Sequence, residues 1–373
     1  MNLRGKLFAV AFMFGGLVLQ SSGCAPVLTW PGVPGKQFIP ANDPFIEYIG
    51  RFDFANPKDV VFDWAGVYIV ARFQGTSCSV LLRDSTDDYD VVIDERAPRI
   101  LHTDSSMVIY NVASGLSDSI PHTIMIQKRT EPLVGAGHFM GFLLDRGMRL
   151  MSPPKRPDRR IEFIGNSITS GYGIEADTSA RHFHPETEDA CLSFASITAR
   201  ELHADYSLIS YSGRGVVRNY GDSDKVSQYP MPALYDRTCC FDSSKKWDFR
   251  SWIPQAVVIN LGTNDFSTHP YPDSAVFVDA YIRLIDRLRS LYPGVTIFCC
   301  SGPMIGERSM GYVREIVRRE RGLEGRNKEV FFVLMKQSIL KRGDLGLVKH
   351  PNVEGAWKMA RVLVREMKLR MLW

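Results

Sequence analysis

The second half of the chain alternates short apolar runs with longer amphipathic runs. The strand-like runs lie at 161–164, 206–210, 256–261, 295–301 and 330–335, and the helical runs lie at 189–204, 275–292 and 353–371. In the helical runs apolar residues recur at intervals of three and four, the pattern of a helix with one face on a core. Such alternation predicts a parallel sheet covered on both faces. We expect a flavodoxin-like, three-layer α/β domain at 161–373.

The first half shows no helical pattern. Short runs of β-branched and aromatic residues recur between turn signals, at 67–73, 78–84, 90–95, 107–113 and 122–128. Strands at this spacing indicate an all-β sandwich. We place the sandwich at 45–152 and a linker rich in proline and charge at 153–160.

The N-terminus has the pattern of an address for export. Arg4 and Lys6 precede an uncharged apolar run at 7–19, which is too short to span a bilayer. This predicts a signal peptide at 1–24. Small residues before Cys24 resemble the site at which bacterial lipoproteins are cleaved and lipidated, although Ser21 stands where leucine is usual. We expect an envelope lipoprotein, in the outer membrane or periplasm, with ordinary secretion as the alternative.

That lipid anchor at Cys24 is the one membrane contact that we expect, and residues 25–44, rich in proline and glycine, are expected to form a tether. A formal net charge of +4 over 373 residues, without a clustered basic face, gives no reason to expect nucleic acid as a partner. The six cysteines after Cys24 are expected to be mostly free and buried. No spacing of histidine and cysteine suggests a metal, and we expect no cofactor. The sequence indicates no oligomeric state.

One hydroxyl group stands at a position suited to chemistry. The apolar run at 161–164 ends in Gly165, and Ser167 follows where the strand would turn into a helix. Open α/β sheets place their active sites at this edge. By itself the turn requires only that Asn166 or Ser167 cap the helix. Three further stretches follow, with Gly213 at 211–221, Asn264 at 260–267 and His350 at 350–360.

Together the four stretches resemble the blocks of SGNH (GDSL-type) hydrolases. Their flanks narrow the likeness, because KRTE at 128–131, MPALYDRT at 231–238 and the residues around the blocks resemble carbohydrate esterase family 2. This resemblance implies a jelly-roll sandwich before the hydrolase domain. It also implies a secreted or envelope-anchored serine esterase that removes O-acetyl groups from plant polysaccharides such as xylan or glucomannan.

By the same resemblance Ser167 is the nucleophile and His350 the general base. The oxyanion hole would consist of the backbone N–H groups of Ser167 and Gly213 and the side-chain amide of Asn264, since the attacked ester oxygen becomes negative and needs fixed donors. The chain departs from many such enzymes in having no carboxylate at 347–349. Asp344 is a possible orienting acid. The alternative is a Ser-His dyad whose imidazole is held by a backbone carbonyl.

Two other functions stay open. One is an esterase or lipase of different acyl specificity on the same site, and the other is a carbohydrate-binding protein with weak or lost turnover. Lys128, Arg129 and Glu131 are expected to contact the second domain in a structural role. Arg218 and aromatic residues near the blocks could shape a sugar cleft, and the aromatic residues could equally be packing.

Overall fold

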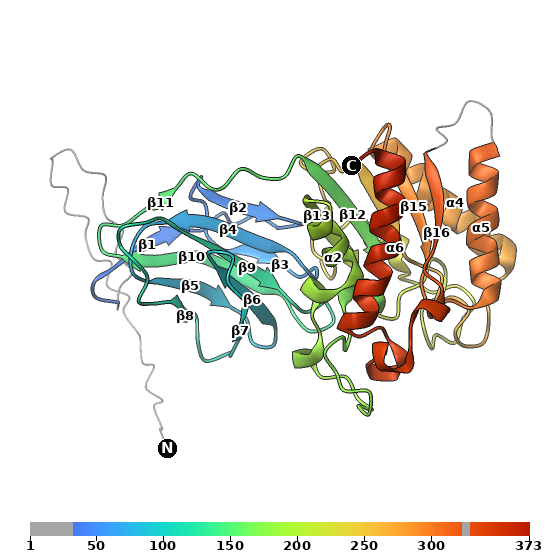
Figure 1. The fold of residues 1–373 in the computed structure, drawn as a ribbon, viewed down its shortest axis with the longest axis horizontal. Helices are drawn as coiled ribbons and strands as arrows, with labels where there is room; N and C mark the ends of the chain where they lie inside the picture. Colours follow the sequence, from blue (N-terminus) through green and yellow to red (C-terminus); the bar gives the residue numbers. More distant parts are fainter. Residues whose placement is uncertain (1–32, 323–328) are drawn as a thin grey trace, which may run out of the picture.

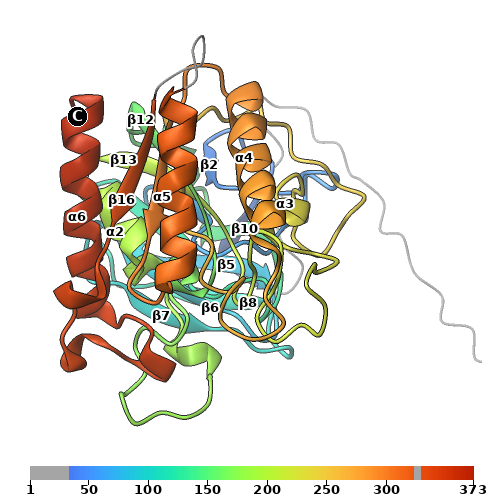
Figure 2. The ribbon, with the colours of Figure 1, turned by 90° about the vertical axis from the view of Figure 1, so that its right-hand side faces the viewer.

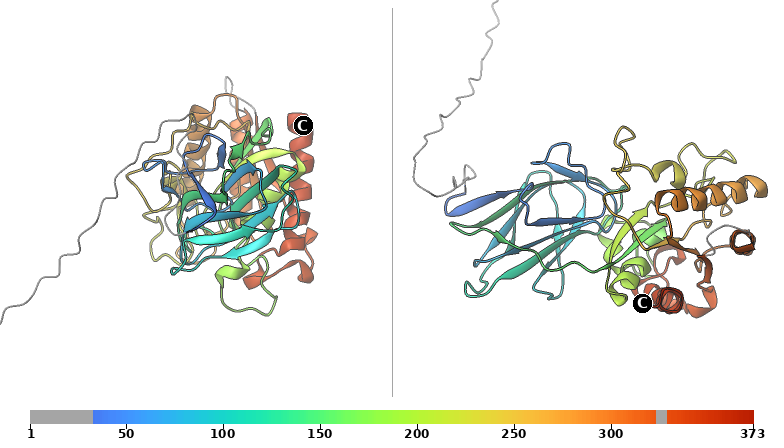
Figure 3. Two further views of the ribbon diagram at one scale, coloured as in Figure 1. Left: turned by 90° about the vertical axis from the view of Figure 1, so that its left-hand side faces the viewer. Right: turned by 90° about the horizontal axis from the view of Figure 1, so that it is seen from above.

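The computed structural model describes residues 33–322 and 329–373. The predicted signal peptide, Cys24 and the first part of the predicted tether therefore lie outside the described residues. The chain forms two parts side by side along its longest axis, an all-β part followed by an α/β part (Figures 1 and 3). Among the described helices, none is both long and apolar enough to span a membrane.

The first part consists of two antiparallel sheets, of five and six strands. One has the order β1 (Lys36–Pro40), β10 (Gly137–Asp145), β5 (Cys78–Arg83) and β8 (Ile109–Ala113), with β3 (Val60–Phe62) beside β10. The other has the order β11 (Leu150–Met151), β4 (Tyr68–Phe73), β9 (His122–Lys128), β6 (Asp88–Ile93) and β7 (Arg99–His102), with β2 (Ile46–Ile49) beside β4. In β4 every second residue is buried, as the period of two requires when one face covers a core. The predicted all-β architecture is confirmed.

The tether prediction is wrong for residues 36–40. They form β1, which pairs with β10 from Lys36 opposite Asp145 to Pro40 opposite Gly141. β1 lies at the edge of its sheet, where the missing N–H of Pro40 removes no bond that the sheet needs. Proline and glycine in this stretch therefore mark the end of an edge strand and not an unstructured connection.

The second part contains a five-stranded parallel sheet in the order β13 (Ala204–Ser210), β12 (Arg159–Gly165), β14 (Ala256–Ile259), β15 (Thr296–Ser301) and β16 (Val330–Leu334). This is the 2-1-3-4-5 order of flavodoxin-like folds. Every residue of β13, β14 and β15 is buried, because helices cover both faces. The predicted fold class is confirmed.

Helices on the two faces close the three layers (Figure 2). α2 (Phe194–Glu201) and α6 (Val353–Met371) pack together on one face, and α4 (Ser274–Leu291) and α5 (Glu307–Gly322) on the other. The short helices are α1 (Ser167–Ser170) and α3 (Met231–Leu234), with 3-10 turns at Pro185–Thr187, Ala190–Leu192, Gln337–Ile339, Arg342–Asp344 and Leu347–Lys349. The sequence reading had assigned no helix to the α5 segment, which buries only a narrow stripe including Val313, Ile316 and Val317.

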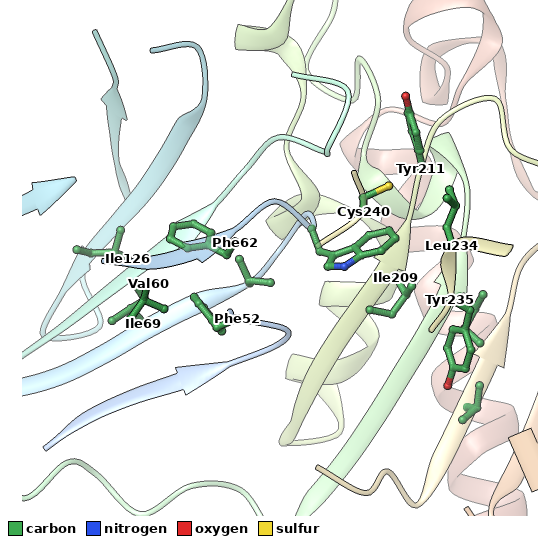
Figure 4. Packing of buried hydrophobic residues seen from close by; sticks show 14 of the residues in the cluster. Phe52, Val60, Phe62, Ile69, Ile126, Ile209, Tyr211, Leu234, Tyr235 and Cys240 are labelled. Atoms are coloured by element: carbon green, nitrogen blue, oxygen red, sulfur yellow. The ribbon is translucent and has the colours of Figure 1, made fainter. Parts of the chain in front are cut away.

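One hydrophobic cluster runs from the sandwich into the α/β part. It joins Phe52 and Phe62 of the sandwich to Ile209 and Tyr235 of the hydrolase-like part (Figure 4). Trp64 belongs to the same cluster, is fully buried, and donates from Nε1 to the carbonyl oxygen of Thr238 at 2.9 Å. The two parts therefore share a core.

Charged side chains also cross this boundary. The guanidinium of Arg129 pairs with Asp90 of the sandwich at 2.8 Å, and with Asp189 at 3.0 Å and Glu175, both of the second part. The predicted contact between the residues at 128–131 and the second domain is confirmed for Arg129. The six cysteines that the structure describes are free and buried, as expected.

Replacing Trp64 with alanine should lower the free energy of unfolding by about 3–5 kcal/mol, since the change leaves a cavity in the shared core and removes a bond to Thr238. Urea unfolding followed by circular dichroism measures this. Phe54→Ala is the control, because Phe54 is 49% exposed, and it should change the free energy by less than about 1 kcal/mol. Equal midpoints for the Trp64 variant and the parent would contradict the shared core.

Candidate active site

Ser167 lies at the carboxyl end of a central strand. β12 ends at Gly165, and Ser167 begins α1, whose N-cap is Asn166; the Asn166 side chain accepts the N–H of Ile168 at 3.4 Å. A Cβ at Gly165 would lie 2.0 Å from Oγ1 of Thr169, so only glycine permits this tight strand-to-helix turn. The turn sets the Ser167 hydroxyl at the sheet edge that the sequence predicted.

His350 meets this serine across 183 residues of sequence. Its Nε2 lies 2.8 Å from Oγ of Ser167, and its Nδ1 lies 3.1 Å from the carbonyl oxygen of Leu347. A carbonyl oxygen only accepts, so the Nδ1 position carries the hydrogen and Nε2 is left to accept from the serine hydroxyl. This is the tautomer that a general base for Ser167 requires.

Burial makes this imidazole hard to protonate. The pKa of His350 is lowered to about 4 because its surroundings exclude water, while the hydrogen bond to Leu347 acts in the opposite direction. The ring is therefore neutral in mildly acidic and neutral solution. It also contacts Tyr172, whose ring stacks in turn on Phe183 at 4.3 Å.

The loop before His350 is shaped by unusual backbone geometry. Val348 and Lys349 have φ values of 43° and 66°, in the left-handed region that side chains rarely adopt. The N–H of Gly346 donates to the carbonyl of His350 at 2.7 Å, and the side chain of Asn352 caps α6 through the N–H of Gly355 at 3.1 Å. This tight turn places the carbonyl oxygen of Leu347 next to the imidazole ring of His350.

Asp344 does not hold the imidazole, which corrects the alternative that the sequence had left open. Its Oδ2 accepts from the backbone N–H of Lys341 and from Nζ of Lys358, both at 2.5 Å. These contacts keep the pKa of Asp344 below its usual range. The carboxylate is engaged with a lysine and a 3-10 turn, so the structure gives His350 a carbonyl partner instead.

Gly213 and Asn264 come from the loops after β13 and β14, and a bond from Asn264 to Arg214 joins the two loops. The amide Nδ2 of Asn264 donates to the carbonyl of Arg214 at 2.9 Å, which uses one of its two hydrogens. Gly213 has a φ of 76°, which favours glycine, and its carbonyl accepts the N–H of Tyr220 at 2.8 Å. Tyr211 N lies 3.4 Å from the carbonyl of Gly165, which ties this loop to the Ser167 turn.

Asp265 is a residue whose importance the sequence reading missed. Its buried carboxylate accepts three consecutive backbone N–H groups, those of Val216 at 3.0 Å, Val217 at 2.7 Å and Arg218 at 3.0 Å. Burial raises its pKa, and the three hydrogen bonds oppose that rise. Asp265 thus fixes the loop after Gly213. Nothing in one sequence shows which amides a buried carboxylate will meet.

Arg218 is not a ligand-binding residue of an open cleft. It is fully buried, and its guanidinium donates to the carbonyl oxygens of Asp224 at 3.1 Å, Thr268 at 2.7 Å and His269 at 3.1 Å. Its role is to join two loops near the site. The interpretation of Arg218 as part of a sugar cleft was wrong.

One group of side chains has ligand types that suit a metal. Atoms of Asp90, Asp189 and Cys191 lie within 4.8 Å of one another. However, Nη1 of Arg129 pairs with both carboxylates, at 2.8 and 3.0 Å. The guanidinium already supplies the positive charge, so this group does not fit a metal ion.

Each of the two parts of the fold matches a known protein family. Residues 48–154 match the family model described as carbohydrate esterase 2 N-terminal, and residues 163–357 match the GDSL-like lipase/acylhydrolase family. An acetylxylan esterase / glucomannan deacetylase of Cellvibrio japonicus is 31% identical over 76% of this chain and 78% of that protein. The cellulase/esterase CelE of Acetivibrio thermocellus is 36% identical over 89% of this chain, which spans only 40% of that longer protein.

A solved structure shares the whole architecture. The family two carbohydrate esterase from Clostridium thermocellum in complex with cellohexaose matches with a TM-score of 0.81 and 35% identity, over 88% of this chain and 99% of that one. Similarity over this share of the chain extends across both parts of the fold. The chain belongs to carbohydrate esterase family 2.

Proposed function

We propose that this protein is a serine esterase that removes O-acetyl groups from polysaccharides such as xylan or glucomannan. The observation that carries the proposal is the 2.8 Å contact between Oγ of Ser167 and Nε2 of His350, at the carboxyl edge of the sheet. The relative named acetylxylan esterase / glucomannan deacetylase supports the substrate class.

The chemistry would run in two halves. Nε2 of His350 takes the hydroxyl proton as Oγ of Ser167 attacks the acetyl carbonyl, and the resulting oxyanion is held by the N–H groups of Ser167 and Gly213 and by the free amide hydrogen of Asn264. The imidazolium then gives its proton to the departing sugar oxygen, which leaves an acetyl-serine. A water molecule, deprotonated by the same ring, releases acetate and restores Ser167.

The fixed donors supply a large part of the expected rate. Loss of one oxyanion donor in comparable hydrolases costs on the order of 10²–10³ in turnover. Asn264 is only 7% exposed and bonded to Arg214, so its amide keeps one orientation before substrate arrives. An oriented donor needs no reorganisation at the moment when charge develops.

A glycan-binding function with weak turnover is the second candidate. It is favoured by the neighbour of known structure, which was solved with cellohexaose, a sugar chain without acetyl groups by its chemistry. An esterase of other acyl specificity is the third, because Ser167 and His350 would serve any ester that reaches them. The same experiments separate all three.

We further propose that the protein is exported and lipidated at Cys24, on the strength of the charged and apolar pattern at 1–24. Metabolic labelling with an alkyne fatty acid should mark the full-length chain in a bacterial host and should fail for Cys24→Ala. Equal labelling of both chains would refute lipidation at Cys24. A cleaved but unlabelled parent would indicate ordinary secretion.

The protein lacking residues 1–24 should release acetate from acetylated xylan and glucomannan, and Ser167→Ala should release none above background. Acetate is measured by a coupled enzymatic assay, with circular dichroism to show that both chains are folded. A folded parent that releases none from either polymer would contradict the proposed activity. Binding of cello-oligosaccharides by calorimetry, and 4-nitrophenyl esters of rising chain length, would then decide between the other two functions.

Activity should persist into acid. A general base works only when unprotonated, and the pKa of His350 is lowered to about 4, so kcat/KM should fall on the acid side with a midpoint near that value. Initial rates with a soluble acetyl ester, from about pH 3 to about pH 8, report this pKa of the free enzyme. An acid limb centred near the ordinary histidine value of about 6.5 would contradict the lowered pKa of His350.

A further inference from the structure

One carboxylate of the sandwich contacts the second part of the chain. Glu131 follows β9, and its side chain is fully buried. Its Oε2 accepts the backbone N–H of Ser212 at 2.5 Å and lies 3.3 Å from Oγ of Ser170. Ser212 directly precedes Gly213, and Ser170 ends the helix that Ser167 begins.

These contacts connect two of the loops that form the candidate active site. Oγ of Ser170 also lies 2.9 Å from Oγ of Ser210, the last residue of β13. A single carboxylate of the first domain therefore bridges α1 and the loop after β13. Glu131 and Ser170 are completely buried, whereas Ser212 is partly buried.

The bond to Ser212 bears on the direction of the Gly213 N–H. That N–H belongs to the peptide between Ser212 and Gly213. The preceding peptide is held by Glu131 through the N–H of Ser212, and the following peptide is held by Tyr220, which donates to the carbonyl of Gly213 at 2.8 Å. With both neighbours held, the Cα atoms on either side of the middle peptide stay in place, which limits the positions of its N–H, although glycine alone would allow many conformations.

The charge of Glu131 is embedded among other buried groups. Its own N–H donates to Oε2 of Glu188 at 3.1 Å, while the nearby ammonium of Lys128 bonds to Asp87 at 2.6 Å and to the carbonyl of Thr130 at 2.9 Å. Burial raises the pKa of Glu131, and the bonds from Ser212 lower it. Without this acceptor the N–H of Ser212 would be left unsatisfied, and the loop would move to recover a bond.

We propose that Glu131 is a positioning residue, supplied by the sandwich, that fixes the Ser212 peptide and so aims the Gly213 N–H at the substrate oxyanion. This inference rests on the proposed esterase function. It predicts that the sandwich is part of the catalytic apparatus and not a separable module. From the sequence we expected only a structural contact with the second domain for Lys128, Arg129 and Glu131.

Two variants of the full domain pair separate reach from charge. Glu131→Gln keeps the length and an oxygen that accepts from Ser212, so kcat should stay within about fivefold of the parent. Glu131→Asp keeps the charge but is one methylene shorter, and kcat should fall about 10²-fold with KM little changed, since a misplacement of about 1 Å has that effect. If Glu131→Asp fails to fold, Glu131→Met takes its place. Methionine is of similar length to glutamate but has no oxygen to accept from Ser212, so the same fall in kcat is expected.

Asp90→Asn is the matched control. Asp90 is also a buried carboxylate at the boundary between the two parts, and its partner Arg129 keeps Asp189 and Glu175. Its kcat should stay within about twofold of the parent. If the role of Glu131 were purely structural, substitutions at Glu131 and at Asp90 would lower activity in the same way, in proportion to the folded protein that is lost.

A second readout is independent of activity. Amide hydrogen exchange, followed by mass spectrometry over 211–214, should quicken in Glu131→Asp and stay near the parent rate in Glu131→Gln. A kcat for the Asp variant equal to or above that of the Gln variant, a loss confined to KM, or unchanged exchange would overturn the positioning role. If the parent hydrolyses no ester, the proposed function fails, and the exchange measurement alone decides whether Glu131 orders this loop.

Discussion

The placement of one part of the molecule on the other depends on the buried guanidinium of Arg51. This sandwich residue is fully buried and donates to the carbonyls of Tyr235 and Arg237, the latter at 2.8 Å, and to Glu162 of β12 at 3.2 Å. It also lies over the ring of Trp247 at 5.5 Å. A buried charge is tolerated only when its partners are in place, and breaking such a pair costs about 3–5 kcal/mol. The shared hydrophobic cluster holds the two parts together, and the charged contacts restrict them to one relative arrangement.

That arrangement explains how the sandwich can contact the candidate active site at the carboxyl edge of the parallel sheet. Arg51 bonds to the strand that leads to Ser167, and Arg129 and Glu131 bond to the segments that follow it. The strand order was predictable, since strict alternation of strand and helix leaves few topologies. The contact of Arg129 with the second part was also predicted, but the buried pair of Arg51 with Glu162 was not, because an arginine or glutamate in one sequence looks the same whether it lies in solvent or at a boundary.

Helices and strands were predictable where their local signal in the sequence is strong. α4 and α6 were placed within a residue or two, because long amphipathic runs repeat their pattern several times. α5 was missed because charged residues dominate its sequence and only one narrow stripe is buried. β1 was missed because a short edge strand with proline resembles a loop. Ser167 and His350 were found through the order of four blocks, whereas the carbonyl of Leu347 was not identifiable, since every residue carries one.

A backbone carbonyl in place of a carboxylate changes what the rest of the site has to do. A carboxylate would stabilise the imidazolium that forms when Ser167 loses its proton. The carbonyl of Leu347 fixes the tautomer but brings no negative charge, and burial lowers the pKa of the ring to about 4. The protonated ring is therefore costly in the free protein. During attack, however, the substrate oxyanion forms at the same time, and a nearby opposite charge favours the imidazolium.

The oxyanion thus stands in for the missing acid, provided that it is held in a fixed place. Where a carboxylate contacts the histidine, the imidazolium is stabilised by two negative charges, the carboxylate and the oxyanion. A loosely held oxyanion then weakens only one of these two interactions. Here no carboxylate of the described residues bonds to the ring of His350, so catalysis depends more strongly on rigid donors. Asp265 and Glu131, two buried carboxylates that hold the loop around Gly213 from opposite sides in the sequence, provide that rigidity.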